Sequence, residues 1–280
     1  MSLIGSPTAP VGTATWYDVD IPGRPAVSAR VFRPHRPSAG CLVWAHGGSW
    51  QYGSAVRWHG MTARLADLSG WDVVSVDYRL APGHRHSAPV EDILTALEWA
   101  HRRSDVAGSG LAVGGDSSGA TVAACAALAA RDRGRRLDAQ VLAYPPLDPE
   151  CRASSYRRDP LAFPTAARLR HAWRAHRGTS PTTVAADGVV LHSTPFEAED
   201  HTGLAPAILA AGRLDPVSGD TLRYARMLRA AHVPVHLIHP PGVGHTDLLD
   251  PAGHLLPPIA RTLRNLPPDP RTSDRKDRSR

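Results

Sequence analysis

The sequence has almost no lysine. Lys276 is the only lysine among 32 basic residues, so the formal net charge of +6 at pH 7 comes almost entirely from arginine. A nucleic-acid-binding surface usually gathers its basic residues on one face or stripe, with aromatic residues between them. Here the arginines are scattered through every segment of the chain. We therefore predict an ordinary basic surface and no nucleic-acid partner.

Cysteine is also scarce, at three residues: Cys41, Cys125 and Cys151. They lie far apart, and none forms a Cys-x-x-Cys pair of the kind that binds zinc. This usage suggests a reducing compartment. His84 and His86 stand close together, but no third His, Asp or Glu follows at ligand spacing, so we predict no metal site.

The chain lacks any long apolar segment. Its first residues show no basic stretch followed by an apolar run, which a secretion signal would need. No run elsewhere approaches the roughly 20 apolar residues of a membrane-spanning helix. We therefore expect a soluble, cytoplasmic protein without a membrane span. The sequence leaves open whether it acts as a monomer or as a homodimer.

Short apolar runs recur along the chain and are typical of buried strands. They cover residues 41–45, 73–76, 111–113, 140–143, 207–210 and 235–238. Helix-like segments lie between them, at 90–101, 119–131 and 217–231. This alternation predicts an α/β fold with a mostly parallel central sheet flanked by helices. Residues 15–33 alternate apolar and polar side chains around a Pro-Gly turn and predict an antiparallel hairpin at the sheet edge.

The strand rhythm stops between about 145 and 201. An Arg-rich helical stretch at 165–177 stands there among Pro, Ser, Asp and Thr residues, which indicates an inserted helical cap. We predict a single domain over residues 1–266 that includes this cap. The basic tail at 267–280 is Pro-rich, then charged, and has no apolar residue, so burial cannot offset its ordering entropy and we predict disorder.

The strongest local motif is Gly-Asp-Ser-Ser-Gly at 115–119. It directly follows the apolar run 111–113 and opens an alanine-rich segment. A serine on a sharp strand-to-helix turn needs small neighbours on both sides, and glycine supplies them. An ordinary helix start is the alternative. The context favours a nucleophile elbow with Ser117 as nucleophile and with the Ser118 N–H at the helix N-terminus, where it would stabilise an oxyanion.

A second motif, His-Gly-Gly-Ser-Trp at 46–50, follows another apolar run. Adjacent glycines let backbone N–H groups approach a bound carbonyl closely. We therefore predict that Gly47 and Gly48 complete an oxyanion hole with Ser118. His46 is expected to organise this loop rather than to catalyse.

A nucleophilic serine needs a base to take its proton and a carboxylate to orient that base. Asp215 stands just past the run 207–210, and His245 lies in a loop rich in Gly and Pro after the run 235–238. The order Ser, Asp, His is the one found in α/β-hydrolases. We predict Asp215 as the acid and His245 as the base, with Asp247 as a weaker alternative acid.

Together these segments resemble the hormone-sensitive-lipase-like (fold-3) branch of the α/β-hydrolase esterases, whose members typically carry HGGG, DYRLAPE, GDSAGG and late Asp-Pro and Gly-x-x-His motifs. The corresponding segments here are 46–50, 77–82, 115–120, 214–216 and 242–245, and the resemblance covers about residues 40–250. It implies hydrolysis of a small-molecule acyl ester through a Ser-His-Asp triad and an acyl-enzyme, with no cofactor.

Two departures from the family pattern stand out. Ser49 replaces the third glycine of HGGG, and Ala120 replaces the last glycine of the elbow motif. Only about forty residues precede the first motif, so the N-terminal cap of the family is expected to be reduced. The HGGSW form is also similar to the HGGxW loop of arylformamidases. Hydrolysis of an amide or formamide, including deacetylation, and a non-catalytic ligand-binding role therefore remain as alternatives.

Overall fold

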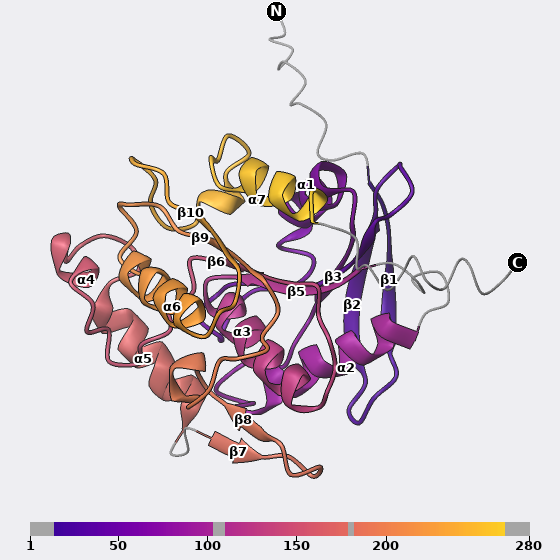
Figure 1. Cartoon of the computed structure of the whole chain (residues 1–280), viewed down its shortest axis with the longest axis horizontal. Helices are drawn as coiled ribbons and strands as arrows, with labels where there is room; N and C mark the ends of the chain where they lie inside the picture. The colour runs from indigo at the N-terminus through magenta and orange to yellow at the C-terminus, as the bar shows by residue number, and fades with distance from the viewer. Residues whose placement is uncertain (1–13, 103–109, 179–181, 267–280) are drawn as a thin grey trace, which may run out of the picture.

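The computed structural model describes residues 14–102, 110–178 and 182–266. Its centre is an eight-stranded sheet with the order β1-β2-β4-β3-β5-β6-β9-β10 and helices on both faces (Figure 1). The predicted α/β fold with a mostly parallel sheet is confirmed. The tail at 267–280, for which we predicted disorder, lies outside the described residues.

The hairpin predicted at the sheet edge is present. Strand β1 (Thr15–Ile21) pairs antiparallel with β2 (Val27–Arg33), and β2 pairs antiparallel with β4. From β4 to β10 all neighbouring strands are parallel. These strands are β3 (Gly40–Ala45), β4 (Asp72–Val76), β5 (Gly110–Asp116), β6 (Ala139–Ala143), β9 (Ala207–Ala210) and β10 (Val235–Ile238).

The central strands are covered on both faces. Every residue of β3, β6 and β9 is buried, which is why these strands are continuous apolar runs rather than alternating ones. Within β3, Leu42 and Trp44 pack into the core on one face, and Val43 packs into the core on the other. Because the strands are parallel, the loops after β3, β5, β9 and β10 all leave the same edge of the sheet.

In the described ranges, five main helices cover the sheet. Helices α1 (His59–Ser69) and α7 (Leu256–Arg264) contribute to the core on one face, and α2 (Ala88–Arg102), α3 (Ser118–Asp132) and α6 (Ser218–Ala230) to the core on the other (Figure 1). Helix α3 is buried from Ser118 to Ala130. Its small alanine side chains let it pack closely against the strands. Sequence patterns predicted α2, α3 and α6 but missed α1 and α7.

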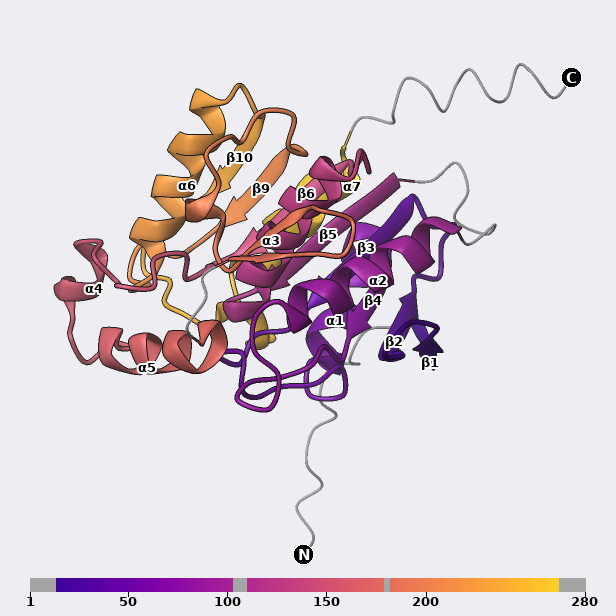
Figure 2. The same cartoon turned by 90° about the horizontal axis from the view of Figure 1, so that it is seen from below.

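The connection between β6 and β9 contains the segment predicted as a cap. It consists of α4 (Ser155–Arg158), α5 (Ala166–Arg177), the hairpin of β7 (Thr182–Val184) and β8 (Val190–His192), and the short helix η2 (Pro195–Glu197). Figure 2 shows α4 and α5 at the left end of the molecule, below α6 in that view. The predicted helix at 165–177 corresponds to α5, whereas the β7–β8 hairpin was not predicted.

Helix α5 packs against the loop that follows β3. The ring of Trp50 stacks on His176 at a centroid distance of 4.7 Å and contacts Trp173 at 4.4 Å. All three side chains are almost completely buried. Burial lowers the pKa of His176 to about 3, so its imidazole stays neutral in this stack at ordinary pH.

Candidate active site

The Gly-Asp-Ser-Ser-Gly motif forms a sharp turn between β5 and α3. Strand β5 ends at Asp116 and helix α3 begins at Ser118, so Ser117 alone makes the turn, with φ 50° and ψ −125°. A positive φ is unfavourable for a residue with a Cβ, and such strain concentrates at functional sites. A Cβ at Gly119 would overlap the carbonyl oxygens of Ala45 and His46. Glycine at 119 therefore lets the elbow lie directly against the end of β3.

Substitution of Gly119 by alanine should be strongly destabilising. Because the added methyl group would meet backbone rather than a flexible side chain, we expect a loss of about 3 kcal/mol and a fall of roughly 10 °C in the unfolding midpoint. Thermal unfolding followed by circular dichroism measures this shift. Gly83→Ala is the matched control, since a Cβ there would meet only ordinary contacts. Equal midpoints for both variants would show that the elbow is not tightly packed.

The three residues predicted as the triad lie in one hydrogen-bonded chain. Ser117 Oγ is 3.0 Å from His245 Nε2, and His245 Nδ1 is 2.8 Å from Asp215 Oδ2. Asp215 is fully buried, and the His245 side chain is 3% exposed. The second carboxylate oxygen of Asp215 accepts the Val217 N–H at 2.9 Å, which fixes the carboxylate plane. This arrangement can pass the Ser117 proton to an imidazole whose tautomer is set by Asp215.

Asp247, the alternative acid, forms hydrogen bonds with the backbone at the start of α7 instead of with His245. Its carboxylate oxygens accept the backbone N–H groups of His254 at 3.1 Å and Leu255 at 2.7 Å. These bonds hold the start of α7 in place. The geometry therefore favours Asp215 over Asp247 as the partner of His245.

The loop after β3 differs from the prediction in one respect. The Gly47 N–H donates to Asp116 Oδ1 at 3.1 Å, so it is not free to bind an oxyanion in this structure. Within the described ranges, the N–H groups of Gly48, Ser49 and Ser118 have no partner in the protein. Gly48 and Ser49 both have positive φ, 116° and 56°. The donor set that the geometry supports is thus Gly48, Ser49 and Ser118, with Ser49 in place of Gly47.

Asp116 is a buried carboxylate that sequence reasoning passed over. Its Oδ1 accepts the Gly47 N–H and the indole N–H groups of Trp58 at 2.8 Å and Trp44 at 3.3 Å. Burial raises the pKa of Asp116 to about 7. The signal in the sequence was an acidic residue at the end of an apolar strand. Because Asp116 binds Gly47, it connects the strand that precedes Ser117 to the loop that contains Gly48 and Ser49.

The raised pKa of Asp116 predicts a pH-dependent stability. An unfolded aspartate ionises near pH 4, whereas Asp116 in the folded protein ionises near pH 7. Between these values the folded state holds the extra proton, so the contribution of Asp116 to stability falls as the pH rises from about 4 to about 7. Asp116→Asn has no proton to lose. The unfolding free energy of Asp116→Asn, relative to that of the wild type, should therefore rise over this range. The expected rise is a few kcal/mol, because each unit of difference in pKa corresponds to about 1.4 kcal/mol.

Chemical denaturation of both proteins at several pH values between 4 and 7 measures this difference. The exposed Asp250 provides a control, because Asp250→Asn removes a carboxylate that is not buried. A difference between Asp116→Asn and wild type that stays constant with pH would contradict the assignment.

His46 supports the same loop. Its ring Nδ1 lies 2.7 Å from the Gly47 carbonyl oxygen, and its own carbonyl oxygen accepts the Tyr78 hydroxyl at 2.7 Å. The two rings stack at 4.5 Å. Nearby, Asp77 accepts the Ala55 N–H at 2.6 Å. These contacts agree with a loop-organising role for His46 and connect the 77–82 segment to the candidate site.

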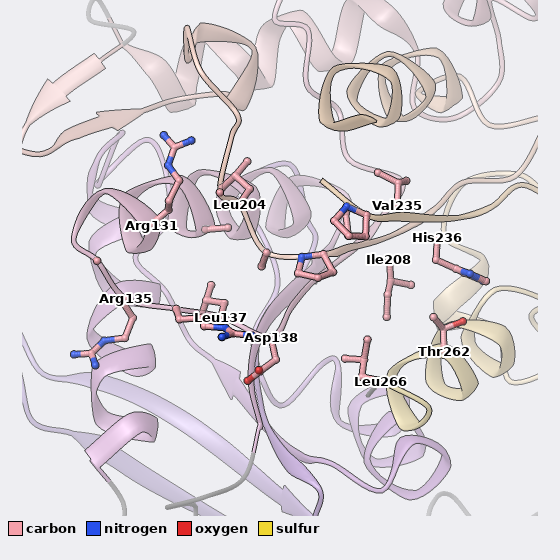
Figure 3. Close-up of a pocket in the computed structure, with 18 residues that line it drawn as sticks. Arg131, Arg135, Leu137, Asp138, Leu204, Ile208, Val235, His236, Thr262 and Leu266 are labelled. Carbon is pink, nitrogen blue, oxygen red and sulfur yellow. The ribbon is translucent and has the colours of Figure 1, made fainter. Parts of the chain in front are cut away.

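A cavity of about 1010 Å³, whose lining side chains are drawn in Figure 3, lies at the edge of the sheet where the parallel strands begin. Its lining includes Ile208 and Val235, near the starts of β9 and β10, whereas Ser117 and His245 follow strand ends. Two of its basic residues are already engaged. Arg131 donates to the carbonyl oxygens of residues 200 and 202, and Arg135 pairs with a glutamate of α2. Although this cavity is large, its position at the strand starts separates it from Ser117 and His245.

Three further findings concern the rest of the described chain. All three cysteines lie in the described ranges, are buried and form no disulfide there. Among the residues that the structure describes, no three His, Cys, Asp or Glu side chains come together as a metal-binding group. In the same part of the chain, every helix is too short or too polar to cross a bilayer.

Comparison with known proteins gives consistent matches. The alpha/beta hydrolase fold family matches residues 42–248. The carboxylic ester hydrolase LipN of Mycobacterium tuberculosis is 35% identical over 235 residues, which are 79% of this chain and 61% of LipN. This chain therefore spans less than two thirds of the length of LipN.

Solved structures match over more of their length. A hyperthermophilic esterase from the archaeon Pyrobaculum calidifontis is 31% identical with a TM-score of 0.81, covering 91% of this chain and 87% of that one. An esterase of the bacterial hormone-sensitive lipase family is 26% identical with a TM-score of 0.77, covering 90% and 84%.

Proposed function

Because this chain belongs to the α/β-hydrolase fold family, with hormone-sensitive-lipase-like esterases among its relatives, we propose that it is a serine-dependent carboxylic ester hydrolase. Its substrate is an ester of a small acyl group. The observation that carries the proposal is the hydrogen-bonded chain from Ser117 through His245 to Asp215, beside three unengaged backbone N–H groups. A complete chain of this kind favours catalysis over a purely ligand-binding role.

In the proposed mechanism, Ser117 Oγ attacks the acyl carbonyl while His245 Nε2 takes its proton. Asp215 stabilises the resulting imidazolium from the Nδ1 side. The oxyanion of the tetrahedral intermediate accepts hydrogen bonds from the N–H groups of Gly48, Ser49 and Ser118. Removal of one such donor in other hydrolases costs about 2.7–4 kcal/mol of transition-state stabilisation. His245 then protonates the leaving group, and water releases the acyl group by the same steps in reverse order.

Hydrolysis of p-nitrophenyl esters of increasing acyl length tests the proposal. We expect turnover of short acyl esters and covalent labelling of Ser117 by a fluorophosphonate, identified by peptide mass spectrometry. An aryl formamide assayed alongside addresses the neighbouring chemistry. Preference for the formamide would make the protein an amide hydrolase that uses the same residues. Absence of both turnover and labelling would support a ligand-binding protein instead.

A further inference from the structure

A cavity of about 340 Å³ lies beside the His245 imidazole. Its walls come from the loop between α4 and α5, which includes Phe163, and from the loop after β9, which includes Leu214. This volume is at the lower end of ligand pockets in proteins. The cavity therefore suits a group about the size of one ring rather than a long chain.

The order of the strands places this cavity on the side of the departing group. Strand β3, whose loop carries the free N–H groups of Gly48 and Ser49, lies next to β5 on one side. Strands β9 and β10, whose loops carry Asp215 and His245, lie beyond β5 on the other side. A carbonyl oxygen bound at the β3 side leaves the other substituents of the reacting carbon on the His245 side. The leaving oxygen must lie there, because His245 Nε2 has to protonate it.

The free surface of the cavity is apolar. Phe163 is 52% exposed and Leu214 is 56% exposed. The Phe163 ring stands edge to face with His245, at a centroid distance of 5.8 Å. Both side chains would lose solvent contact against a bound apolar group, which is favourable. A second aromatic ring packed on Phe163 would add a favourable ring-to-ring contact.

The charged residues of the cavity are already engaged. The Arg158 guanidinium donates to the Arg213 carbonyl oxygen, and Asp159 Oδ1 accepts the Leu161 N–H at 3.0 Å. Because Arg158 and Asp159 carry opposite charges, together they give the cavity no net charge that would select an ionic group of one sign. The lining thus favours an uncharged, apolar leaving group.

We infer that this cavity binds the leaving group of the substrate, and that the leaving group is an alcohol bearing an aromatic ring. This inference rests on the proposed ester hydrolysis and specifies its substrate class. In the acylation step the bond between Ser117 Oγ and the carbonyl carbon forms, and the bond from that carbon to the alcohol oxygen breaks. The proton that His245 took from Ser117 passes to the alcohol oxygen. The released aromatic alcohol leaves through the Phe163 side.

Benzyl acetate and ethyl acetate provide a matched pair to test the inference. They share the acyl group, so their deacylation step is identical, and their leaving alcohols are of similar basicity. We expect a higher kcat/KM for benzyl acetate in the wild type. Phe163→Ala and Leu214→Ala should each lower kcat/KM for benzyl acetate roughly tenfold, the usual effect of one lost apolar contact, and for ethyl acetate much less.

Two further variants separate a specificity role from a structural one. Phe163→Tyr keeps the ring and should retain the preference for benzyl acetate. Leu161→Ala removes an 88% exposed side chain that does not line the cavity, and should leave both rates unchanged. Equal losses on both esters in Phe163→Ala, or no preference in the wild type, would overturn the inference while hydrolysis itself stands. No turnover of either ester or of p-nitrophenyl acetate would overturn the proposed function together with it.

Discussion

Replacement of Ser117 by alanine is expected to lower kcat for p-nitrophenyl acetate by about 10⁶-fold, the size of the loss when the nucleophilic serine of a serine protease is removed. Without Oγ, His245 has no proton to take and no acyl-enzyme can form. Alanine keeps the Cβ of the L-residue, so the elbow conformation at φ 50° should be unchanged. Steady-state hydrolysis together with fluorophosphonate labelling measures the effect, and the variant should take up no label.

The neighbouring serine provides the control. Ser118 is proposed to act through its backbone N–H, which alanine retains, so Ser118→Ala should lose far less activity than Ser117→Ala. Thermal unfolding of both variants shows whether the fold is preserved. Comparable activity in Ser117→Ala and wild type would remove Ser117 from the mechanism.

Asp215→Asn is expected to lower kcat by about 10⁴-fold, the loss seen when the corresponding aspartate of a serine protease is changed in the same way. Asparagine can still accept the Val217 N–H through its oxygen. Its NH₂ group would then face His245 Nδ1, where the carboxylate now lies at 2.8 Å. An imidazole that accepts at Nδ1 carries its proton on Nε2 and cannot take one from Ser117. The pH profile of kcat measured with p-nitrophenyl acetate reports this change.

Asp247→Asn is the matched control for this substitution. It alters a carboxylate two residues from His245 that binds the backbone at the start of α7. We expect at most about a tenfold loss of kcat, with some loss of stability from the weakened backbone hydrogen bonds. A larger loss of kcat in Asp247→Asn than in Asp215→Asn would reverse the assignment of the acid.

Much of the sheet could be predicted from the sequence, because buried parallel strands are continuous apolar runs. All six apolar runs are strands, and the hairpin of β1 and β2 is where the Pro-Gly turn indicated. Strand order could not be predicted, since it depends on pairing between distant segments. Helix α1 was missed because it follows a loop rich in Gly and Ser without a clear start signal, and its N-cap residue Trp58 makes no side-chain cap. Strands β7 and β8 have three residues each, which is too short to show an alternation of apolar and polar side chains.

For the candidate site, sequence order was sufficient to bring Ser117, His245 and Asp215 together, because each follows a strand and strand ends meet at one edge. The donors of the 46–50 loop were harder to predict. The positive φ of Ser49 and the bond from Gly47 to Asp116 are set by tertiary packing. A glycine in the sequence shows that the backbone can approach closely, but not which group it approaches.

The stack of Trp50 on His176 has a consequence for changing this protein by design or by natural variation. Trp50 directly follows Ser49, so helix α5 is in contact with the segment proposed to supply N–H donors. Random mutagenesis of α5 to widen the substrate range would therefore also shift those donors, and gains in range should come with losses in rate. The loop around Phe163 has no such contact with Trp50 among the described residues. Directed evolution of selectivity should accordingly begin in that loop, away from the backbone of the 46–50 segment.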